Sequence, residues 1–399
     1  MGYGVWGMGR QTADHSPKSK QPSPFIFAFH HNPYPIIHRQ LMKKIRIGIV
    51  GTGGMANGHA DAFKAIPGVT LAACLDVVPG RGEAFAAKHG IAKVATDLDG
   101  LLADVDAVSV VTPDRFHADP SLKILAAGRH LLCEKPLAVT LDEARAVARA
   151  AAKAGRKGVK HMVNFSYRRS AAMQKAITLM EQGKLGALRH VHSMYLQCWL
   201  AQPVWGHWTE EAWLWRIQQA AGSAGVLGDV GCHILDLTTA VAGEVEAVRC
   251  TLATFPKFTK QGEAVTTYKG KVLDANDSAV IELCFKGGAL GVVHTTRWAT
   301  GHANHLRCEV HGTDGAMQFD LDAGYDVLNT CLGKDAVKNT WKATTLKPTP
   351  SNYQRFITAI KTGVNPQSDV FRGAQVQAYL DACFRSAASG KHEAVQDWR

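Results

Sequence analysis

The sequence has no long apolar run and no cysteine framework. None of its segments approaches the ~20 consecutive apolar residues that a membrane-spanning helix requires, so we expect no membrane association. Its nine cysteines are scattered without paired or metal-type spacing, and an odd number argues against a disulfide framework. Cysteine usage of this kind suits a reducing compartment, and we expect a cytoplasmic protein.

Acidic residues are also in deficit. The 399 residues include 34 Asp and Glu against 45 Lys and Arg, which gives a formal net charge of +11. Such a charge can indicate nucleic acid or an anionic substrate, but the basic residues are dispersed and form no stripe with aromatic residues. We therefore expect no nucleic-acid partner, and a phosphorylated sugar stays open as a substrate. The length suits two domains, each with its own core.

Residues 1–42 differ in kind from the rest of the chain. They hold several Pro, His, Ser and Gln residues, and their one apolar stretch, 25–29, is too short for a signal-peptide core. We hypothesise that Met42 is the natural start and that the extension before it is disordered or spurious. An intact-mass measurement that shows the mature chain to begin near Met1 would contradict this hypothesis.

The segment after this extension has the pattern of a dinucleotide-binding turn. Residues 44–50 are apolar and β-branched, as in a buried parallel strand, and they lead into Gly-Thr-Gly-Gly-Met-Ala at 51–56. The first glycine permits the tight turn, the second lets the backbone approach a pyrophosphate, and the next helix offers free N–H groups to phosphates. The residues expected to contact the dinucleotide here are Gly51, Gly53, Gly54 and Met55.

A second apolar strand, 69–75, ends in Asp76, near the spacing at which an acidic residue binds the ribose hydroxyls. A carboxylate at this place accepts hydrogen bonds from a ribose diol and repels a 2′-phosphate, so NAD is favoured over NADP. Arg81 keeps NADP open as an alternative, because an arginine nearby could bind the phosphate.

Further strands are expected at 107–111, 130–133 and 160–164, alternating with helices at 121–127 and 141–154, the last with Thr140 as its N-cap. The first of these strands ends at Thr112-Pro113 and the second at Glu134-Lys135-Pro136. Ligands of open α/β sheets bind at the carboxyl ends of the strands. One sheet edge therefore collects the glycine turn, Asp76 and Lys135.

A second motif, Gly-Asp-Val-Gly-Cys-His at 228–233, follows about a hundred residues later. If it is helical, Asp229 and His233 lie on one face, one turn apart. With Lys135 they form a proton-transfer set suited to an alcohol or a carbonyl. Each residue taken singly has an ordinary alternative, namely a surface lysine, a helix-capping aspartate and a buried histidine.

With these motifs, the chain resembles the Gfo/Idh/MocA family, that is, the glucose–fructose oxidoreductase and inositol dehydrogenase family. The matching stretches are 47–53, 112–117, 128–137, 164–168 and 228–236, and the resemblance extends from about residue 43 to the C-terminus. It implies an α/β protein: a Rossmann-type, doubly wound parallel sheet in residues 43–165, followed in residues 166–399 by a substrate-binding and oligomerisation domain with an open, mostly antiparallel sheet.

The resemblance also implies NAD(P)-dependent redox chemistry on sugars, sugar derivatives or inositols. By position, Lys135, Asp229 and His233 look like the catalytic lysine, aspartate and histidine of the family. The residues that it adds to the cofactor site are Thr112, Pro113, His117, Glu134 and Lys135. We also expect Glu134 to support the structure rather than transfer protons.

The second domain should contain a helix at 170–182 and strands at 189–197, 277–285, 291–296, 306–311 and 317–321, with Gly-rich turns between several of them. Strand–turn–strand pairs indicate an antiparallel sheet. Helices should cover one face, and association into a homodimer or homotetramer through this sheet would cover the other.

Five tryptophans, Trp199, Trp205, Trp208, Trp213 and Trp215, precede Arg216 and the second motif. Indoles suit the CH face of a sugar or cyclitol ring, although a core or subunit-contact segment is the alternative. The residues expected to contact substrate are Lys135, Tyr167, Arg168, Trp205, Trp208, Arg216, Asp229 and His233. The pairs His190/His192 and His302/His305 lack a third acidic or sulfur ligand at a suitable spacing, so no metal site is expected.

In the oxidative direction, His233 would take the proton of a secondary hydroxyl while hydride passes to the nicotinamide, and Lys135 would stabilise the developing alkoxide. General-base catalysis of this kind contributes roughly 10²–10⁴ in rate. Asp229 would bind substrate or orient the imidazole. Lys135 stays open as the terminal proton acceptor, because desolvation beside NAD⁺ can lower the pKa of a lysine.

Two other functions stay open, NAD-assisted elimination of a glycosidic bond and dinucleotide sensing without chemistry.

Lys135 must turn back from its strand towards the cofactor within one or two residues. We therefore expect the Lys135–Pro136 bond to be cis or to lie in a tight turn.

Overall fold

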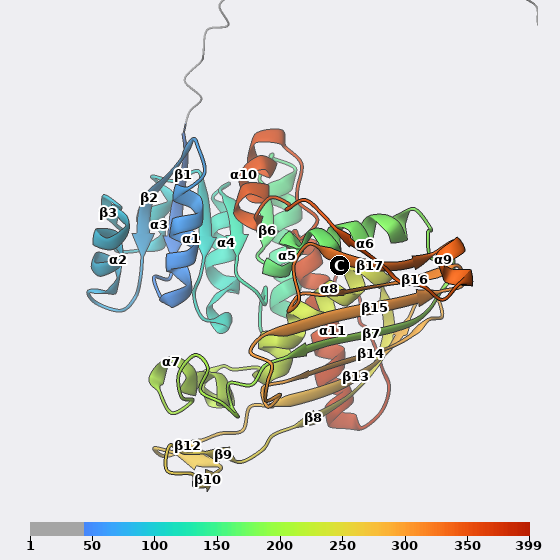
Figure 1. Ribbon diagram of the computed structural model, residues 1–399. Coiled ribbons are helices and arrows are strands. Elements are labelled where there is room, and N and C mark those ends of the chain that lie inside the picture. The colour runs from blue at the N-terminus through green and yellow to red at the C-terminus, as the bar shows by residue number, and fades with distance from the viewer. Residues whose placement is uncertain (1–43) are drawn as a thin grey trace, which may run out of the picture. The chain divides into compact units, whose positions relative to one another are not determined.

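The computed structural model describes residues 44–399. The interpretation of residues 1–42 and the hypothesis about Met42 therefore lie outside the described residues. Two large sheets, one of six strands and one of nine, organise the described chain, and helices pack on both (Figure 1). The helices of this part of the chain include none that is both long and apolar enough to cross a bilayer.

The six-stranded sheet is entirely parallel, with strand order β3-β2-β1-β4-β5-β6. Its strands are β1 (Ile45–Val50), β2 (Val69–Leu75), β3 (Lys93–Val94), β4 (Ala107–Val110), β5 (His130–Cys133) and β6 (His161–Val163). This is the doubly wound order of dinucleotide-binding sheets, in which the order of successive strands reverses between β1 and β4, and ligands bind at the carboxyl ends of these two strands. The expected Rossmann-type sheet is confirmed.

Helices connect these strands: α1 (Gly54–Lys64), α2 (Arg81–His89), α3 (Leu98–Leu102), α4 (Ala118–Ala126) and α5 (Leu141–Gly155). Thr140 caps α5 as expected. Its hydroxyl accepts a hydrogen bond from the backbone N–H of Glu143, and the Glu143 carboxylate accepts one from the N–H of Thr140.

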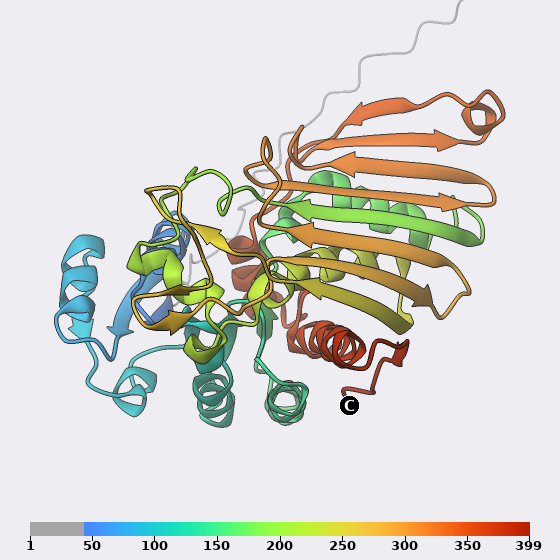
Figure 2. The same cartoon turned by 90° about the horizontal axis from the view of Figure 1, so that it is seen from below.

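The nine-stranded sheet has the order β18-β17-β16-β15-β7-β14-β13-β8-β19 and is open at both edges (Figure 2). All its pairs are antiparallel except β7 with β14, so the expected mostly antiparallel sheet is confirmed. Its strands are β7 (Leu188–Leu196), β8 (Val245–Ala253), β13 (Ser278–Phe285), β14 (Leu290–Thr296), β15 (His305–Gly312), β16 (Gly315–Asp320), β17 (Val327–Leu332), β18 (Lys342–Thr345) and β19 (Glu393–Ala394).

Helices α6 (Ala171–Glu181), α8 (Cys232–Ala242) and α11 (Val370–Ser389) cover one face of this sheet (Figure 1). The strands alternate accordingly. Along β13 every second side chain is buried. On the opposite face of the sheet, Val280 of β13 is 52% exposed and Leu290 of β14 is 60% exposed. One face of the sheet is thus free of any cover from residues 44–399.

The C-terminal part of the chain returns to the first sheet. Helix α10 (Asn352–Thr362) packs on α1, where the ring of Tyr353 meets those of His59 and Phe63 at 4.9 and 5.2 Å between centroids. Helix α11 packs on both α5 and β8, so it joins the two sheets. The remaining short elements are α7 (Glu211–Leu214), β9 (Lys257–Phe258), β10 (Ala264–Val265), β11 (Thr267–Tyr268), β12 (Lys271–Val272) and α9 (Lys334–Val337).

Candidate active site

The turn after β1 has the shape of a phosphate cradle. Gly51 has φ +85°, and a Cβ there would lie 2.9 Å from the backbone of Val111 and Thr112, so only glycine fits. A Cβ on Gly53 or Gly54 would meet no atom within 4 Å. The N-terminus of α1 carries no side-chain cap and no acidic residue in its first turn. Its N–H groups are thus available to an anion.

Asp76 lies at the end of β2, beside this turn. One carboxylate oxygen accepts hydrogen bonds from the N–H and hydroxyl of Thr52, at 2.8 and 2.7 Å. The other accepts from the N–H of Val78 at 2.9 Å and from Arg81 Nε at 3.2 Å. Burial raises the pKa of Asp76, but these hydrogen bonds outweigh it and hold the pKa below its ordinary value. Asp76 is therefore a fixed anion beside the glycine turn.

The loop after β4 contains Thr112, Pro113 and His117. The His117 ring is buried, with Nε2 2.8 Å from the Thr112 carbonyl oxygen and Nδ1 2.6 Å from that of Pro136. His117 thereby ties the loop after β4 to the loop after β5. Pro113 and Met55, by contrast, are exposed.

Glu134 is buried under the same edge. Its carboxylate lies 2.8 Å from His59 Nε2 and accepts a hydrogen bond of 2.6 Å from Asn164 Nδ2. Burial raises the pKa of Glu134, but His59 and the neighbouring Lys135 overcome this and lower it to about 2. Protein groups occupy the Glu134 carboxylate, as the expected structural role of Glu134 requires. A contact between Glu134 and the cofactor stays a prediction.

Lys135 leaves the end of β5 through a cis peptide bond to Pro136, one of the two forms expected. Its Nζ donates hydrogen bonds to the Asp229 carboxylate (Oδ1, 2.7 Å) and to the Asp229 carbonyl oxygen (2.9 Å). Burial lowers the pKa of Lys135, but the Asp229 carboxylate raises it more, so the pKa lies above its ordinary value. The lysine is a cation aimed at the second motif.

Asp229 lies between two cations. The second motif is helical, with a π-helical turn at Leu227–Gly231 ahead of α8. The Asp229 carboxylate accepts the bond from Lys135 on one oxygen and a 3.0 Å bond from Arg297 Nη2 on the other, with Arg216 Nε 3.9 Å away. Burial raises the pKa of Asp229, but these three cations hold it well below its usual range.

His233 lies one turn further along, in the first turn of α8, and is buried. Its ring packs edge-on against Tyr167, with 4.9 Å between centroids, and its Nδ1 has no hydrogen-bond partner among residues 44–399. Burial, and then the charge of Lys135, lower the pKa of His233 to about 3. The imidazole is therefore neutral at physiological pH, and both oxygens of Asp229 are bonded to cations rather than to this ring.

These features agree with the comparison with known families. A model of an oxidoreductase family with an NAD-binding Rossmann fold matches residues 45–165, and a model of the Gfo/Idh/MocA C-terminal domain matches residues 173–318. The chain belongs to the Gfo/Idh/MocA oxidoreductase family. The expected family and its dinucleotide, NAD, are thereby confirmed.

Members of the Gfo/Idh/MocA family with known activities include several similar proteins. A levoglucosan dehydrogenase of Pseudarthrobacter phenanthrenivorans is 30% identical over 300 residues, which are 70% of this chain and 75% of that protein. An inositol 2-dehydrogenase of Rubrobacter xylanophilus is 27% identical over 365 residues, 89% of this chain and 94% of that protein. A levoglucosan dehydrogenase solved with NADH and levoglucosan matches with a TM-score of 0.76 at 28% identity, covering 89% of this chain and 100% of that one.

The glycine turn fits NAD in this Gfo/Idh/MocA chain. The space over Gly53 and Gly54 and the uncapped end of α1 would hold the pyrophosphate, and Asp76 would accept hydrogen bonds from the adenosine ribose. The nicotinamide end would then lie towards the carboxyl ends of β4 and β5, where Thr112 and Lys135 stand.

Two expected substrate contacts are corrected. Arg168 is buried and forms two hydrogen bonds of 2.7 Å with Asp236, so its guanidinium is committed to a buried ion pair. Trp208 is buried in a small core and donates a 2.6 Å hydrogen bond to the Phe258 carbonyl oxygen. The sequence signal was ambiguous for both, because a functional and a structural side chain of these types have the same local pattern.

Two other expected substrate contacts, Trp205 and Arg216, are less buried. Trp205 is 43% exposed and stacks on Trp213 with 6.2 Å between centroids. Arg216 packs over Trp215 at 4.5 Å and reaches towards Asp229. The Trp205 indole is exposed and the Arg216 side chain is 26% exposed, whereas Trp199 joins Trp208 in the core.

Tyr167 belongs to a polar cluster next to His233. Its hydroxyl lies 2.5 Å from that of Tyr195 and accepts a 2.8 Å hydrogen bond from Asn304 Nδ2. Tyr195 donates to Asn304 Oδ1 at 2.5 Å, and Gln197 Nε2 donates to the same oxygen at 3.0 Å. The cluster fixes the Tyr167 ring against the imidazole.

Sequence reasoning missed Arg297, Asn276 and Asn304. Arg297 is fully buried and also donates to the carbonyl oxygens of Arg216 and Gly225. Asn276 holds the start of the π-helical turn, since its Oδ1 accepts from the Leu227 N–H at 2.9 Å. The sequence carried no clear signal for Arg297, because its burial, which arginine rarely shows unless it is paired, is a property of the fold.

The expectation of no metal site rested on sequence spacing, and that reason does not hold. The fold brings Asp322 next to His302 and His305, so this pair has an acidic neighbour after all.

Proposed function

We propose that this protein oxidises a secondary hydroxyl of a sugar, sugar derivative or cyclitol, with NAD as hydride acceptor, or catalyses the reverse reduction. The observation that carries this is the assembly of the Lys135 cation and the neutral His233 around Asp229, at the carboxyl edge of an NAD-binding sheet. The named activities of the similar proteins, on levoglucosan and inositol, support a cyclic polyol substrate.

The protonation states of His233 and Lys135 define the role proposed for each side chain. His233 is unprotonated at neutral pH, so it can take the proton of the substrate hydroxyl. Lys135 is protonated and donates hydrogen bonds, so it can stabilise negative charge on the same oxygen as it develops. NAD, when bound, accepts the hydride from the carbinol carbon. Of the two proton acceptors left open by the sequence, the structure favours His233.

Asp229 acts on Lys135 rather than on the imidazole. Its carboxylate fixes the Nζ position and keeps the lysine charged, while Arg297 holds the other carboxylate oxygen. A substrate hydroxyl that enters between Lys135 and His233 would add to this network. Tyr167, Arg216 and Trp205 are the further groups proposed to contact the substrate.

We also propose that residues 43–165 bind the dinucleotide and that residues 166–399 bind the substrate and form a homodimer or homotetramer. The uncovered face of the nine-stranded sheet, with Val280 and Leu290, supports association through that face. All nine cysteines are free thiols, which supports a cytoplasmic location.

Incubation with a panel of sugars, glycosides and cyclitols and NAD⁺ tests the function, with NADH absorbance and released aglycone read together. NADH formation dependent on one class of polyol is expected. Aglycone released without net NADH would instead show NAD-assisted elimination. Tight NAD binding with neither product across the panel would indicate a sensor and overturn the proposal.

A further inference from the structure

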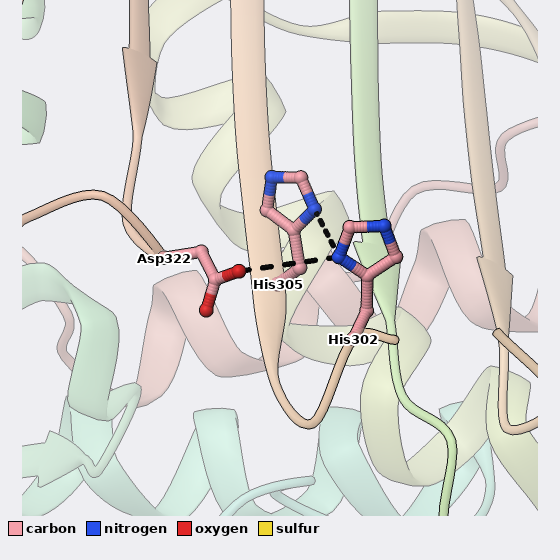
Figure 3. Close-up of side chains that lie close together, drawn as sticks. All are labelled: His302, His305 and Asp322. Carbon is pink, nitrogen blue, oxygen red and sulfur yellow. Dashed lines mark hydrogen bonds and ion pairs between the residues drawn. The ribbon is translucent and has the colours of Figure 1, made fainter. Parts of the chain in front are cut away.

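Two histidines and an aspartate meet at one end of the nine-stranded sheet, outside the proposed active site (Figure 3). His302 lies in the loop between β14 and β15, His305 is the first residue of β15, and Asp322 follows the end of β16. Their ligand atoms all lie within 4.8 Å of one another. Sequence spacing hides this group because β15 and β16 are paired in the sheet, which brings the start of one beside the end of the other.

The two imidazoles face each other through nitrogen atoms. His305 Nδ1 and His302 Nδ1 are 3.1 Å apart. Two nitrogen ligands of a tetrahedral zinc ion, each with a Zn–N distance of about 2.0–2.1 Å, are about 3.3–3.4 Å apart. The two nitrogen atoms are therefore only about 0.2–0.3 Å closer together than one edge of a zinc tetrahedron. Asp322 Oδ2 lies 3.9 Å from His302 Nδ1, and its half-exposed carboxylate can rotate towards the same point.

Asp320 organises two of the three ligands. Its Oδ2 accepts a hydrogen bond of 2.9 Å from His305 Nε2, which leaves the lone pair of a neutral His305 ring on Nδ1, the atom that faces His302. Its Oδ1 accepts a 2.9 Å bond from the N–H of Asp322 and fixes the start of that loop. A carboxylate on the far nitrogen of a ligating histidine is the usual support of a zinc-bound imidazole.

We propose that His302 Nδ1, His305 Nδ1 and Asp322 Oδ2 bind a zinc ion, with water as the fourth ligand and Asp320 as the supporting carboxylate. Two imidazoles and one carboxylate are a ligand set that zinc accepts. On metal binding, the ion takes the place of the proton that His302 Nδ1 donates to His305 Nδ1, and a neutral His302 then carries its single proton on Nε2. His302 and Asp322 are 40% and 50% exposed in their side chains, so the site is open to metal from solvent.

The zinc ion would also act on the proposed substrate site. Asn304 lies between the two histidine ligands in the chain and hydrogen-bonds to both Tyr167 and Tyr195 beside His233. Ordering the 302–305 segment would fix Asn304, and through it the Tyr167 ring. The zinc site itself does not depend on the proposed dehydrogenase activity, because its ligands are separate from the catalytic set.

Equilibrium dialysis of the chelator-treated full-length protein against Zn²⁺, with Co²⁺ absorption as a second probe, tests the site. We expect one equivalent of tightly bound metal and visible Co²⁺ bands of low-symmetry, four-coordinate type. His302→Ala and Asp322→Asn should each remove that equivalent. Asp320→Asn should weaken the affinity about 10–100-fold, as is usual for a lost supporting carboxylate.

His190→Ala is the matched control, since His190 is an exposed histidine of the same sheet and should leave the metal content unchanged. The chain also has His30 and His31 outside the described residues, and the comparison of variants separates their binding from this site. Thermal melting of each apo variant shows whether it is folded. Failure of the folded wild-type protein to retain an equivalent of zinc, or equal retention by His302→Ala and Asp322→Asn, would overturn the proposal.

Discussion

Lys135 Nζ donates a 2.7 Å hydrogen bond to the carboxylate of Asp229, across 94 residues of sequence. This contact joins the edge of the nucleotide-binding sheet to the turn that leads into α8. Because the carboxylate raises the pKa of the lysine, the same contact fixes both the position and the charge of Lys135.

Lys135→Met should abolish turnover and leave NAD affinity nearly unchanged, because the expected phosphate and ribose contacts come from the glycine turn and Asp76. Methionine keeps most of the length but removes the charge. Steady-state rates and NAD titration by protein fluorescence measure the two effects. A loss of NAD affinity as large as the loss of rate would contradict the catalytic assignment of Lys135.

His233→Ala should lower kcat by about 10²–10⁴, the usual contribution of a general base. In the wild-type enzyme the pKa of His233 is about 3, so kcat/KM should show no decline caused by this group as the pH falls through the ordinary histidine range. A variant that keeps more than about a tenth of the activity would argue against a general base.

The stability of the protein should respond to the same histidine. The folded-state pKa of about 3 is below the unfolded value, so the unfolded chain binds the proton first. The contribution of His233 is full above about pH 6.5 and declines below it, by at most ~1.4 kcal/mol per pH unit. Denaturant unfolding of wild type and His233→Phe at pH 7 and at lower pH should show a shallower decline for the variant.

Asp76→Ser should shift cofactor preference from NAD towards NADP. The substitution removes the negative charge that would repel a 2′-phosphate, and it releases Arg81, whose Nε now lies 3.2 Å from the carboxylate. The ratio of kcat/KM for the two dinucleotides measures the shift. Asp76→Ser combined with Arg81→Ala is the control and should gain less for NADP. A wild-type enzyme that already prefers NADP would refute the assignment of Asp76.

Substitution of two tryptophans should have different effects, one on the stability of the protein and the other on substrate binding. Trp208→Ala removes a fully buried indole and should lower the free energy of unfolding by about 3–5 kcal/mol. Trp205→Ala, at a half-exposed position, should leave stability within about 1 kcal/mol of wild type and raise KM for the substrate. Chemical denaturation and steady-state kinetics test the pair. An unchanged KM in Trp205→Ala would remove Trp205 from the substrate site.

Val280→Asp together with Leu290→Asp should reduce the oligomer to smaller species, because both side chains stand on the uncovered sheet face. Light scattering coupled to gel filtration measures the mass. Val337→Asp is the control, since Val337 is 89% exposed on α9, outside the strands of the sheet. An identical mass for the double variant and the wild type would show that association does not use this face.

Local patterns in the sequence were sufficient for the nucleotide-binding half. Several features depend only on residues that are close together in the sequence. They are the order of strand, glycine turn, helix, strand and acidic residue, the Thr140 cap, and the alternation of buried residues along β13. Each depends on backbone geometry within a few residues, which amino-acid type controls directly. The proposed catalytic residues Lys135, Asp229 and His233 could also be named, because the stretches around them resemble a known family.

Contacts between distant segments were decided only by the tertiary structure. Arg297 reaches Asp229 across 68 residues, Arg168 turns to Asp236 instead of the substrate, and Asp322 joins His302. A side chain of given type has the same local signature whether it faces a ligand, a buried partner or water. Which of these it meets depends on strand register and on the packing of helices against sheets, and these are properties of the whole fold.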